Sequence, residues 1–262
     1  MATRLGRRNS LFVLPSRAAI RTWLGRSQYG RRAVEIYGRG LFLYRLRAGW
    51  EGWPGMYESF NGQQARLRAV RALIERFEPD GFIETGTFLG STTRFFAGNG
   101  VPVYSAEIDH LYWLLAKLRL GWRSGVQLVR GDSRAVLERL AAERPFSRPF
   151  VYLDAHWGHD HPLHTEIALL CEYWSEVLIV VDDFAVNGDS GYVYDRGLSL
   201  AEVQLPATVD TALPATPSAS ETGARRGTLY IAHGEDAKLA LRESVRRGLL
   251  REPAKKRAPR SA

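Results

Sequence analysis

The fold of this chain is decided by the stretch Phe82-Ile-Glu-Thr-Gly-Thr-Phe-Leu-Gly-Ser-Thr-Thr93. It begins as a short apolar run and continues through two glycines, Gly86 and Gly90, into residues that commonly start a helix. Glycines let the backbone turn sharply and approach a ligand closely, and the amides at a helix N-terminus attract polar or anionic groups. The stretch therefore predicts a first parallel strand whose carboxyl end holds a nucleotide-type cofactor.

Two familiar loops of this kind are excluded by single residues. A phosphate-binding P-loop has Lys after its second glycine, where this chain has Ser91. The dinucleotide-binding fingerprint has a glycine where this chain has Phe88. The hydroxyls of Ser91, Thr92 and Thr93 are expected to cap the helix that follows the loop.

Helical and strand-like patterns alternate along the centre of the chain. Residues 63–77 have an apolar face at helical spacing, which Pro79-Asp-Gly81 ends. Five short apolar segments follow, at 81–84, 103–107, 126–130, 150–154 and 177–182, and helical segments begin near Ser91, His110, Ser133 and Pro162. Such alternation is typical of an α/β fold with a doubly wound, mostly parallel sheet and helices on both faces. We expect 226–232 to add an antiparallel edge strand, and 206–223, rich in Pro, Ala, Ser and Thr, to form a flexible loop.

An acidic residue lies at or just after the end of each of these five segments. Ligands bind at the carboxyl ends of the strands in a doubly wound sheet, so five acidic ends at one edge indicate a site. Glu107, after the second strand, can accept hydrogen bonds from both hydroxyls of a ribose. Asp132 and Ser133, after the third strand, are placed to meet an adenine amino group. The acidic residues are Glu84, Glu107, Asp132, Asp154 and the pair Asp182 and Asp183.

The order and approximate spacing of these residues resemble the class I S-adenosylmethionine-dependent methyltransferases. The loop reads Glu-x-Gly-x-x-x-Gly, which is similar to motif I of that family. The resemblance implies a Rossmann-like domain that binds S-adenosylmethionine, with the amino and carboxylate ends of the cofactor along the glycine loop. The matching cofactor-binding positions are Glu84, Gly86, Gly90, Glu107 and Asp132, with Thr87, Ser91, Ser133 and Asp154 beside them.

A second group of candidate site residues lies at the ends of the fourth and fifth strands. It is carried by the segments Tyr152-Leu-Asp-Ala-His-Trp157 and Ile179-Val-Val-Asp-Asp-Phe184. Asp154, Asp182 and Asp183 offer hard oxygen ligands, which suit Mg²⁺ or a similar divalent cation better than zinc. The arrangement is similar to the metal site of catechol-type O-methyltransferases, which have Asn where this chain has Asp183. The resemblance implies that a metal ion holds a substrate hydroxyl near the methyl group and lowers its pKa.

His156 is the leading candidate for the general base, because a histidine near neutrality can take the hydroxyl proton. With Asp154 it completes the predicted catalytic pair. The catechol enzymes have a lysine shortly after their metal-binding Asp, so His156 corresponds to it by location only. His159, His161 and His164 are alternatives as base or as metal ligands, although their spacing fits neither the zinc-protease helix nor a zinc finger. The aromatic residues that either line the acceptor pocket or serve as packing are Trp157, Tyr192 and Tyr194.

The two ends of the chain differ from its centre in charge. The 262 residues carry a net charge of +8, but the first fifty hold eleven arginines against the single acid Glu35. We expect a basic, aromatic-containing N-terminal extension at 1–59, one methyltransferase domain at 60–235, and a basic C-terminal helix with a disordered tail at 236–262. Because the positive charge belongs to the ends, it is a weak argument that the folded centre binds nucleic acid. The single cysteine, Cys171, is expected to be buried packing.

The predicted activity is transfer of a methyl group from S-adenosylmethionine to a hydroxyl oxygen of a small molecule or sugar, in the cytoplasm. The N-terminus leaves three roles open: a structural arm or lid, contact with an anionic membrane surface, and targeting. The alternatives to this activity are an RNA or protein methyltransferase and a non-catalytic cofactor-binding or membrane-associated protein. Leu153-Asp-Ala-His stands where an amino-methylating enzyme has an Asn-Pro-Pro-Tyr-type motif. The sequence leaves the acceptor and the oligomeric state open.

Overall fold

The computed structural model describes residues 58–121, 123–156 and 162–253. Most of the predicted N-terminal extension, together with Trp157, His159 and His161, lies outside the described residues. Among the residues described, no helix is both long and apolar enough to cross a membrane.

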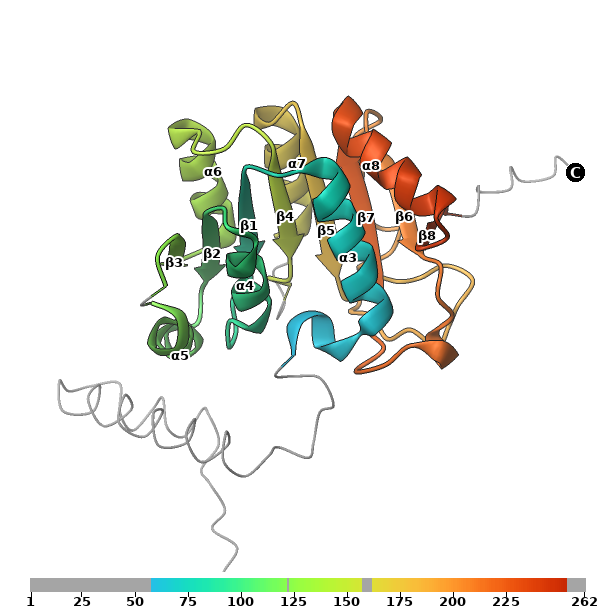
Figure 1. Ribbon diagram of the computed structural model, residues 1–262, viewed down its shortest axis with the longest axis horizontal. Coiled ribbons are helices and arrows are strands. Elements are labelled where there is room, and N and C mark those ends of the chain that lie inside the picture. The colour runs from blue at the N-terminus through green and yellow to red at the C-terminus, as the bar shows by residue number, and fades with distance from the viewer. Residues whose placement is uncertain (1–57, 122, 157–161, 254–262) are drawn as a thin grey trace, which may run out of the picture. The chain divides into compact units, whose positions relative to one another are not determined.

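One eight-stranded sheet forms the centre of the fold (Figure 1), in the order β3-β2-β1-β4-β5-β7-β6-β8. The predicted parallel strands β1 to β5 are confirmed, and each runs parallel to its neighbours among them. Their carboxyl ends therefore meet at one edge, and the strand order switches between β1 and β4, where ligands of doubly wound sheets bind. The strands are β1 Gly81–Thr85, β2 Val103–Glu107, β3 Val126–Arg130, β4 Pro149–Leu153, β5 Val177–Asp182, β6 Asp210–Pro214, β7 Thr228–His233 and β8 Leu250–Arg251.

The far side of the sheet is antiparallel, and here the structure corrects two expectations. β7 pairs antiparallel with β5, as predicted, but it does not form the edge, because β6 and then β8 lie outside it. β6 lies in the segment predicted to be a flexible loop. Its Ala212 and Leu213 are fully buried, so contacts with the rest of the sheet, rather than a strong local strand pattern, account for its structure.

Helices cover both faces of the sheet. One apolar core includes residues of α3, α4 and α8, and a second includes residues of α6 and α7 on the other side of the strands. Figure 1 shows α3 and α8 side by side, and the two helices are in contact. The central strands β4 and β5 are buried along their whole length, as expected for parallel strands covered on both faces. The helices are α3 Gln64–Phe77, α4 Ser91–Phe96, α5 His110–Leu120, α6 Ser133–Glu143, α7 Leu163–Tyr173 and α8 Glu235–Arg246, with short 3₁₀ turns η1 Ser59–Gly62, η2 Ala97–Asn99 and η3 Ser218–Ser220.

The predicted boundary at residue 235 does not separate a tail from the fold. The helix expected there is present as α8, but its Ala237, Ala240 and Leu241 are buried in the same apolar core as residues of α3. After it, β8 pairs with β6. The folded unit therefore extends through Arg251, because α8 covers sheet surface that would otherwise be exposed.

Candidate functional site

The glycine loop makes a tight turn at the carboxyl end of β1. Gly86 has φ of +85°, and a Cβ added there would lie 2.2 Å from the carbonyl oxygen of Asp154. The amides of Gly86 and Thr87 donate to the carbonyl of Ala106, at 2.9 and 3.1 Å, which ties the loop to β2. The loop therefore needs glycine at position 86, because β1 ends in direct contact with the end of β4.

Glu84 is buried beneath this loop. Its Oε2 accepts hydrogen bonds from the hydroxyls of Ser105, at 2.6 Å, and Thr93. Burial raises the pKa of Glu84 to about 7, and the nearby charge of Glu107 adds to the shift. A carboxyl poised near neutrality gains from a cationic ligand, which would favour its ionised form.

The hydroxyls of Thr92 and Thr93, which were expected to cap α4, make hydrogen bonds to neighbouring segments instead. Gly90 is the N-cap residue and has no side-chain cap. Thr93 instead donates to Glu84, and Thr92 accepts from the amide of Phe60 at 3.4 Å. These hydroxyls join the loop to its neighbours because both the buried Glu84 and the start of η1 need polar partners.

Glu107 connects the glycine loop to the start of α5. Its Oε2 accepts from the amide of Phe88 and its Oε1 from the amide of Asp109, both at 2.8 Å. Phe88 has φ of +49°, a left-handed conformation that is uncommon for a bulky residue. A carboxylate has about four acceptor positions, and the backbone amides of Asp109, Phe88 and Ile108 engage that of Glu107, so it keeps acceptor capacity for a ligand. Burial raises the pKa of Glu107.

The other predicted cofactor-binding residues make contacts with neighbouring segments of the fold. Asp132 caps α6 by accepting from the amide of Arg134 at 2.9 Å, and its ion pair with the Arg134 side chain, at 2.6 Å, lowers its pKa. Ser133 is buried at the start of α6. The Thr87 hydroxyl is also buried and lies 2.6 Å from that of Ser105, and the backbone carbonyl of Ser91 accepts from Ser59 at 2.8 Å. Thr87 therefore supports the loop from inside.

Asp182, at the end of β5, is fully engaged by protein groups. Its Oδ1 accepts from Arg66 at 2.5 Å and from the amide of Asp183 at 2.8 Å. Its Oδ2 accepts from the Tyr152 hydroxyl at 2.8 Å and from Asn61 at 3.0 Å. Burial alone would raise the pKa of Asp182, but Arg66, together with the hydrogen bonds from Tyr152 and the amide of Asp183, holds that pKa below its ordinary value.

Asp183 has an arginine partner of its own. Arg226 donates to Asp183 and also to Asp195, at 2.7 Å. Burial, and then the charge of Asp182, raise the pKa of Asp183 to about 7 against the opposing effect of Arg226. The two neighbouring carboxylates therefore differ in protonation, with Asp182 held ionised and Asp183 titrating near neutrality.

The predicted metal ligands do not fit a metal site in the described part of the chain. No group of three His, Cys, Asp or Glu side chains is placed there to hold an ion. Asp182 and Asp183 instead face Arg66 and Arg226. We therefore derive no step of the chemistry through a metal ion at these carboxylates.

The predicted catalytic pair differs in exposure. Asp154, directly after β4, keeps part of its surface exposed, whereas His156 is 1% exposed. The Nε2 of His156 lies 3.2 Å from the carbonyl oxygen of Asp182, and because a carbonyl only accepts, this nitrogen carries the proton. Burial, followed by the charges of Asp182, Asp183 and Glu84, raises the pKa of Asp154 well above its ordinary value.

The remaining candidates serve other roles or lie at the surface. The Tyr192 side chain is buried and its hydroxyl donates to the carbonyl of Thr216 at 2.9 Å, so it packs the loop after β5. Tyr194 and His164 are exposed. Burial raises the pKa of Cys171 to about 11, which agrees with a packing role and not with a nucleophile.

Several residues of this site were missed from the sequence. Phe60, Asn61 and Gly62 have φ of 57°, 58° and 71°, a strained left-handed run that brings Asn61 to Asp182. Arg66 follows on α3, at helical spacing with the buried Val70. An arginine on the apolar face of a predicted helix was the available signal, because a buried guanidinium needs an anionic partner.

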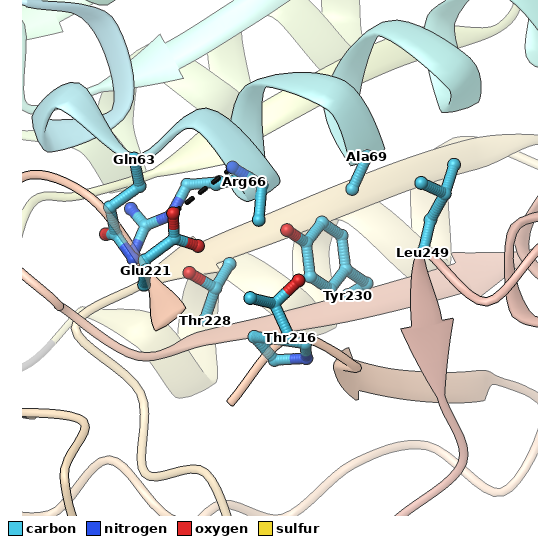
Figure 2. A pocket seen from close by; sticks show the side chains of 10 residues that line it. Gln63, Arg66, Ala69, Thr216, Glu221, Thr228, Tyr230 and Leu249 are labelled. Carbon is cyan, nitrogen blue, oxygen red and sulfur yellow. Dashed lines mark hydrogen bonds between the residues drawn. The ribbon is translucent and has the colours of Figure 1, made fainter. Parts of the chain in front are cut away.

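A cavity of about 10 Å³ lies beside Arg66, between α3 and β7 (Figure 2). Gln63 Oε1, Arg66 Nε and Thr228 Oγ1 line it, and none of them has a hydrogen-bond partner among the described residues. The volume and the three polar atoms suit one buried water molecule. Figure 2 also shows Glu221, which accepts from the amide of Ala65 at 3.2 Å and so fixes the start of α3.

Glu166 gives a test of the electrostatics beside the cofactor residues. It is fully buried on α7, and burial raises its pKa to about 7, partly opposed by the Ser133 and Thr85 side chains. A group whose pKa is raised by folding stabilises the fold at pH values below its pKa in the unfolded chain. This stabilisation is lost as the pH rises through the folded-state pKa of about 7. Relative to Glu166→Gln, wild type should therefore lose about 2 to 3 kcal/mol of unfolding free energy between pH 5 and pH 8. Urea unfolding of both proteins at the two pH values measures this, and an unchanged difference would contradict it.

Comparisons with known proteins bear on the fold. Neither the models of known protein families nor the curated proteins gave a match to this chain. Among solved structures, a putative caffeoyl-CoA O-methyltransferase from Staphylococcus aureus is 14% identical, with a TM-score of 0.50 over 76% of this chain and 100% of that one. An O-methyltransferase from Bacillus cereus, in complex with SAH, is 15% identical, with a TM-score of 0.49 over 82% of this chain and 99% of that one. The predicted Rossmann-like α/β fold is confirmed, and the chain shares it with the Staphylococcus aureus protein.

Proposed function

We propose that this protein is an S-adenosylmethionine-dependent methyltransferase that acts on a hydroxyl oxygen of a small molecule or sugar. The observation that carries the proposal is the placement of Glu107. Its carboxylate lies at the end of β2, the strand next to β1, and binds the glycine loop through the amide of Phe88. The fold shared with a protein described as a caffeoyl-CoA O-methyltransferase agrees with this activity.

The cofactor would lie along the carboxyl ends of β1, β2 and β3. Glu107 would accept hydrogen bonds from the ribose hydroxyls, and Asp132 would meet the adenine amino group. The methionine end would follow the glycine loop, where the ammonium group favours ionised Glu84. This placement directs the sulfonium methyl group toward the ends of β4 and β5.

Methyl transfer at this position is an in-line displacement. The acceptor oxygen forms a bond to the methyl carbon while the carbon–sulfur bond breaks. The electron pair of the broken bond stays on the sulfur, which thereby loses its positive charge. The hydroxyl proton passes to a base. We assign this base to Asp154, because it is partly exposed at the end of β4 whereas His156 is buried and holds the backbone of Asp182. The cationic cofactor lowers the raised pKa of Asp154 and so prepares the carboxylate.

The proposal is tested by measuring binding and transfer on the same protein. Titration calorimetry should show that wild type and Asp154→Asn both bind S-adenosylmethionine. With labelled cofactor and a panel of hydroxyl acceptors, Asp154→Asn should transfer about 100-fold more slowly than wild type or worse, since loss of a general base costs about 10² to 10⁴. An absence of cofactor binding by wild type would reject the function, and transfer to RNA but to no small molecule would favour the nucleic-acid alternative.

A further inference from the structure

Each of the two carboxylates at the end of β5 is held by an arginine. Arg66 Nη1 lies 2.5 Å from Asp182 Oδ1, and both side chains are 2% exposed. Arg226 binds Asp183, whose side chain is 5% exposed, and extends to Asp195. The two guanidinium groups together supply the charge that a divalent cation would bring to this edge of the sheet.

Asp182 has no spare acceptor position among its contacts with the described residues. Arg66 and the amide of Asp183 use Oδ1, while Tyr152 and Asn61 use Oδ2. These four donors match the capacity of a carboxylate. A metal ion bound to Asp182 would have to displace one of them inside a buried site, and displacing Arg66 would leave its charge buried without a partner, which is strongly unfavourable.

Arg66 is fixed by more than its ion pair. Its Nη1 also lies 3.0 Å from the Tyr152 hydroxyl, and its Nη2 donates to the backbone carbonyls of Arg226 and, at 3.4 Å, Gly227. The guanidinium thus links α3, β4, β5 and the segment before β7. An arginine held from four sides keeps its position without a metal ion, because these contacts are made within the fold.

We propose that Arg66 and Arg226 take the place of a divalent cation at Asp182 and Asp183, so that this protein transfers methyl groups without a metal ion. The inference rests on the proposed function. The acceptor hydroxyl is then activated by a protein base, and the arginines neutralise the carboxylates that would otherwise repel one another beside the reacting oxygen.

The test measures metal binding separately from activity. The full chain and Asp183→Asn are freed of metal with a chelator, and Mn²⁺ is titrated into each while the free ion is followed by electron paramagnetic resonance. Asparagine keeps the size of the side chain and can still accept from Arg226, so the comparison isolates the charge at Asp183. We expect equal Mn²⁺ binding by the two proteins. Wild-type binding that Asp183→Asn loses would overturn the inference.

Activity supplies the second readout. The rate of methyl transfer by wild type should change less than twofold when a chelator replaces added Mg²⁺. A tenfold loss that Mg²⁺ restores would overturn the inference. Calorimetry with S-adenosylmethionine on the same metal-free sample distinguishes failure of the proposed function from failure of the inference. An absence of cofactor binding rejects the proposed function. Metal-dependent transfer with intact cofactor binding rejects only the inference.

Discussion

Replacement of Glu107 by alanine is expected to weaken the binding of S-adenosylmethionine by at least about 100-fold, because two hydrogen bonds to a charged group are worth about 3 to 6 kcal/mol. In the proposed binding mode, the variant loses the acceptors for both ribose hydroxyls. It also frees the amides of Phe88 and Asp109, which Glu107 binds at 2.8 Å. The glycine loop is then less well ordered before the cofactor arrives. Titration calorimetry of wild type and Glu107→Ala measures the change directly.

Two controls separate binding from general damage to the fold. Glu75→Gln changes an exposed carboxylate on α3 and should leave the affinity unchanged. Glu107→Gln keeps the size of the side chain but retains only one carbonyl oxygen as an acceptor, so it should bind with an affinity between those of wild type and the alanine variant. An alanine variant that unfolds at the wild-type temperature and binds the cofactor with wild-type affinity would refute the role of Glu107.

The parallel half of the sheet was readable from the sequence because its signals are local. β2, β3 and β5 begin and end at the residues predicted for them. β5, for example, is buried along its whole length and is therefore a nearly continuous apolar segment. The acidic strand ends were equally visible, because the geometry of a doubly wound sheet puts all such ends at one edge. β6 was not predicted from the sequence, because its strand structure depends on pairing with β7 and β8 and is not marked by a local sequence pattern.

The ion-pair partners of the acidic residues at the strand ends could not be predicted from local sequence signals. Asp182 and Asp183 look alike in the sequence, but their ion pairs join residues 116 and 43 positions apart. Whether a carboxylate faces a cation from a metal ion or from an arginine is decided by the packing of α3 and of the segment before β7. The sequence could therefore place the site, whereas its electrostatics required the tertiary structure.

Replacement of Arg66 by alanine is expected to lower the free energy of unfolding by about 3 to 5 kcal/mol, the usual cost of removing one partner of a buried ion pair. The variant leaves Asp182 buried, with Tyr152, Asn61 and a backbone amide as its remaining partners. Urea unfolding measures the loss. Arg68→Ala removes an exposed arginine from the same helix and should change stability by less than about 0.5 kcal/mol.

The pH dependence of this loss distinguishes an unpaired charge from a simple cavity. Arg66, together with the hydrogen bonds from Tyr152 and the amide of Asp183, holds the pKa of Asp182 below its ordinary value against the effect of burial. Without Arg66, burial raises that pKa, so the folded variant takes up a proton that the unfolded chain releases, and its stability falls as the pH rises. The gap between wild type and Arg66→Ala should therefore be larger at pH 8 than at pH 5, and the added substitution Asp182→Asn should narrow it at pH 8. A gap that is the same at both pH values would mean that Arg66 acts through packing alone, and that the charge of Asp182 is neutralised by another group.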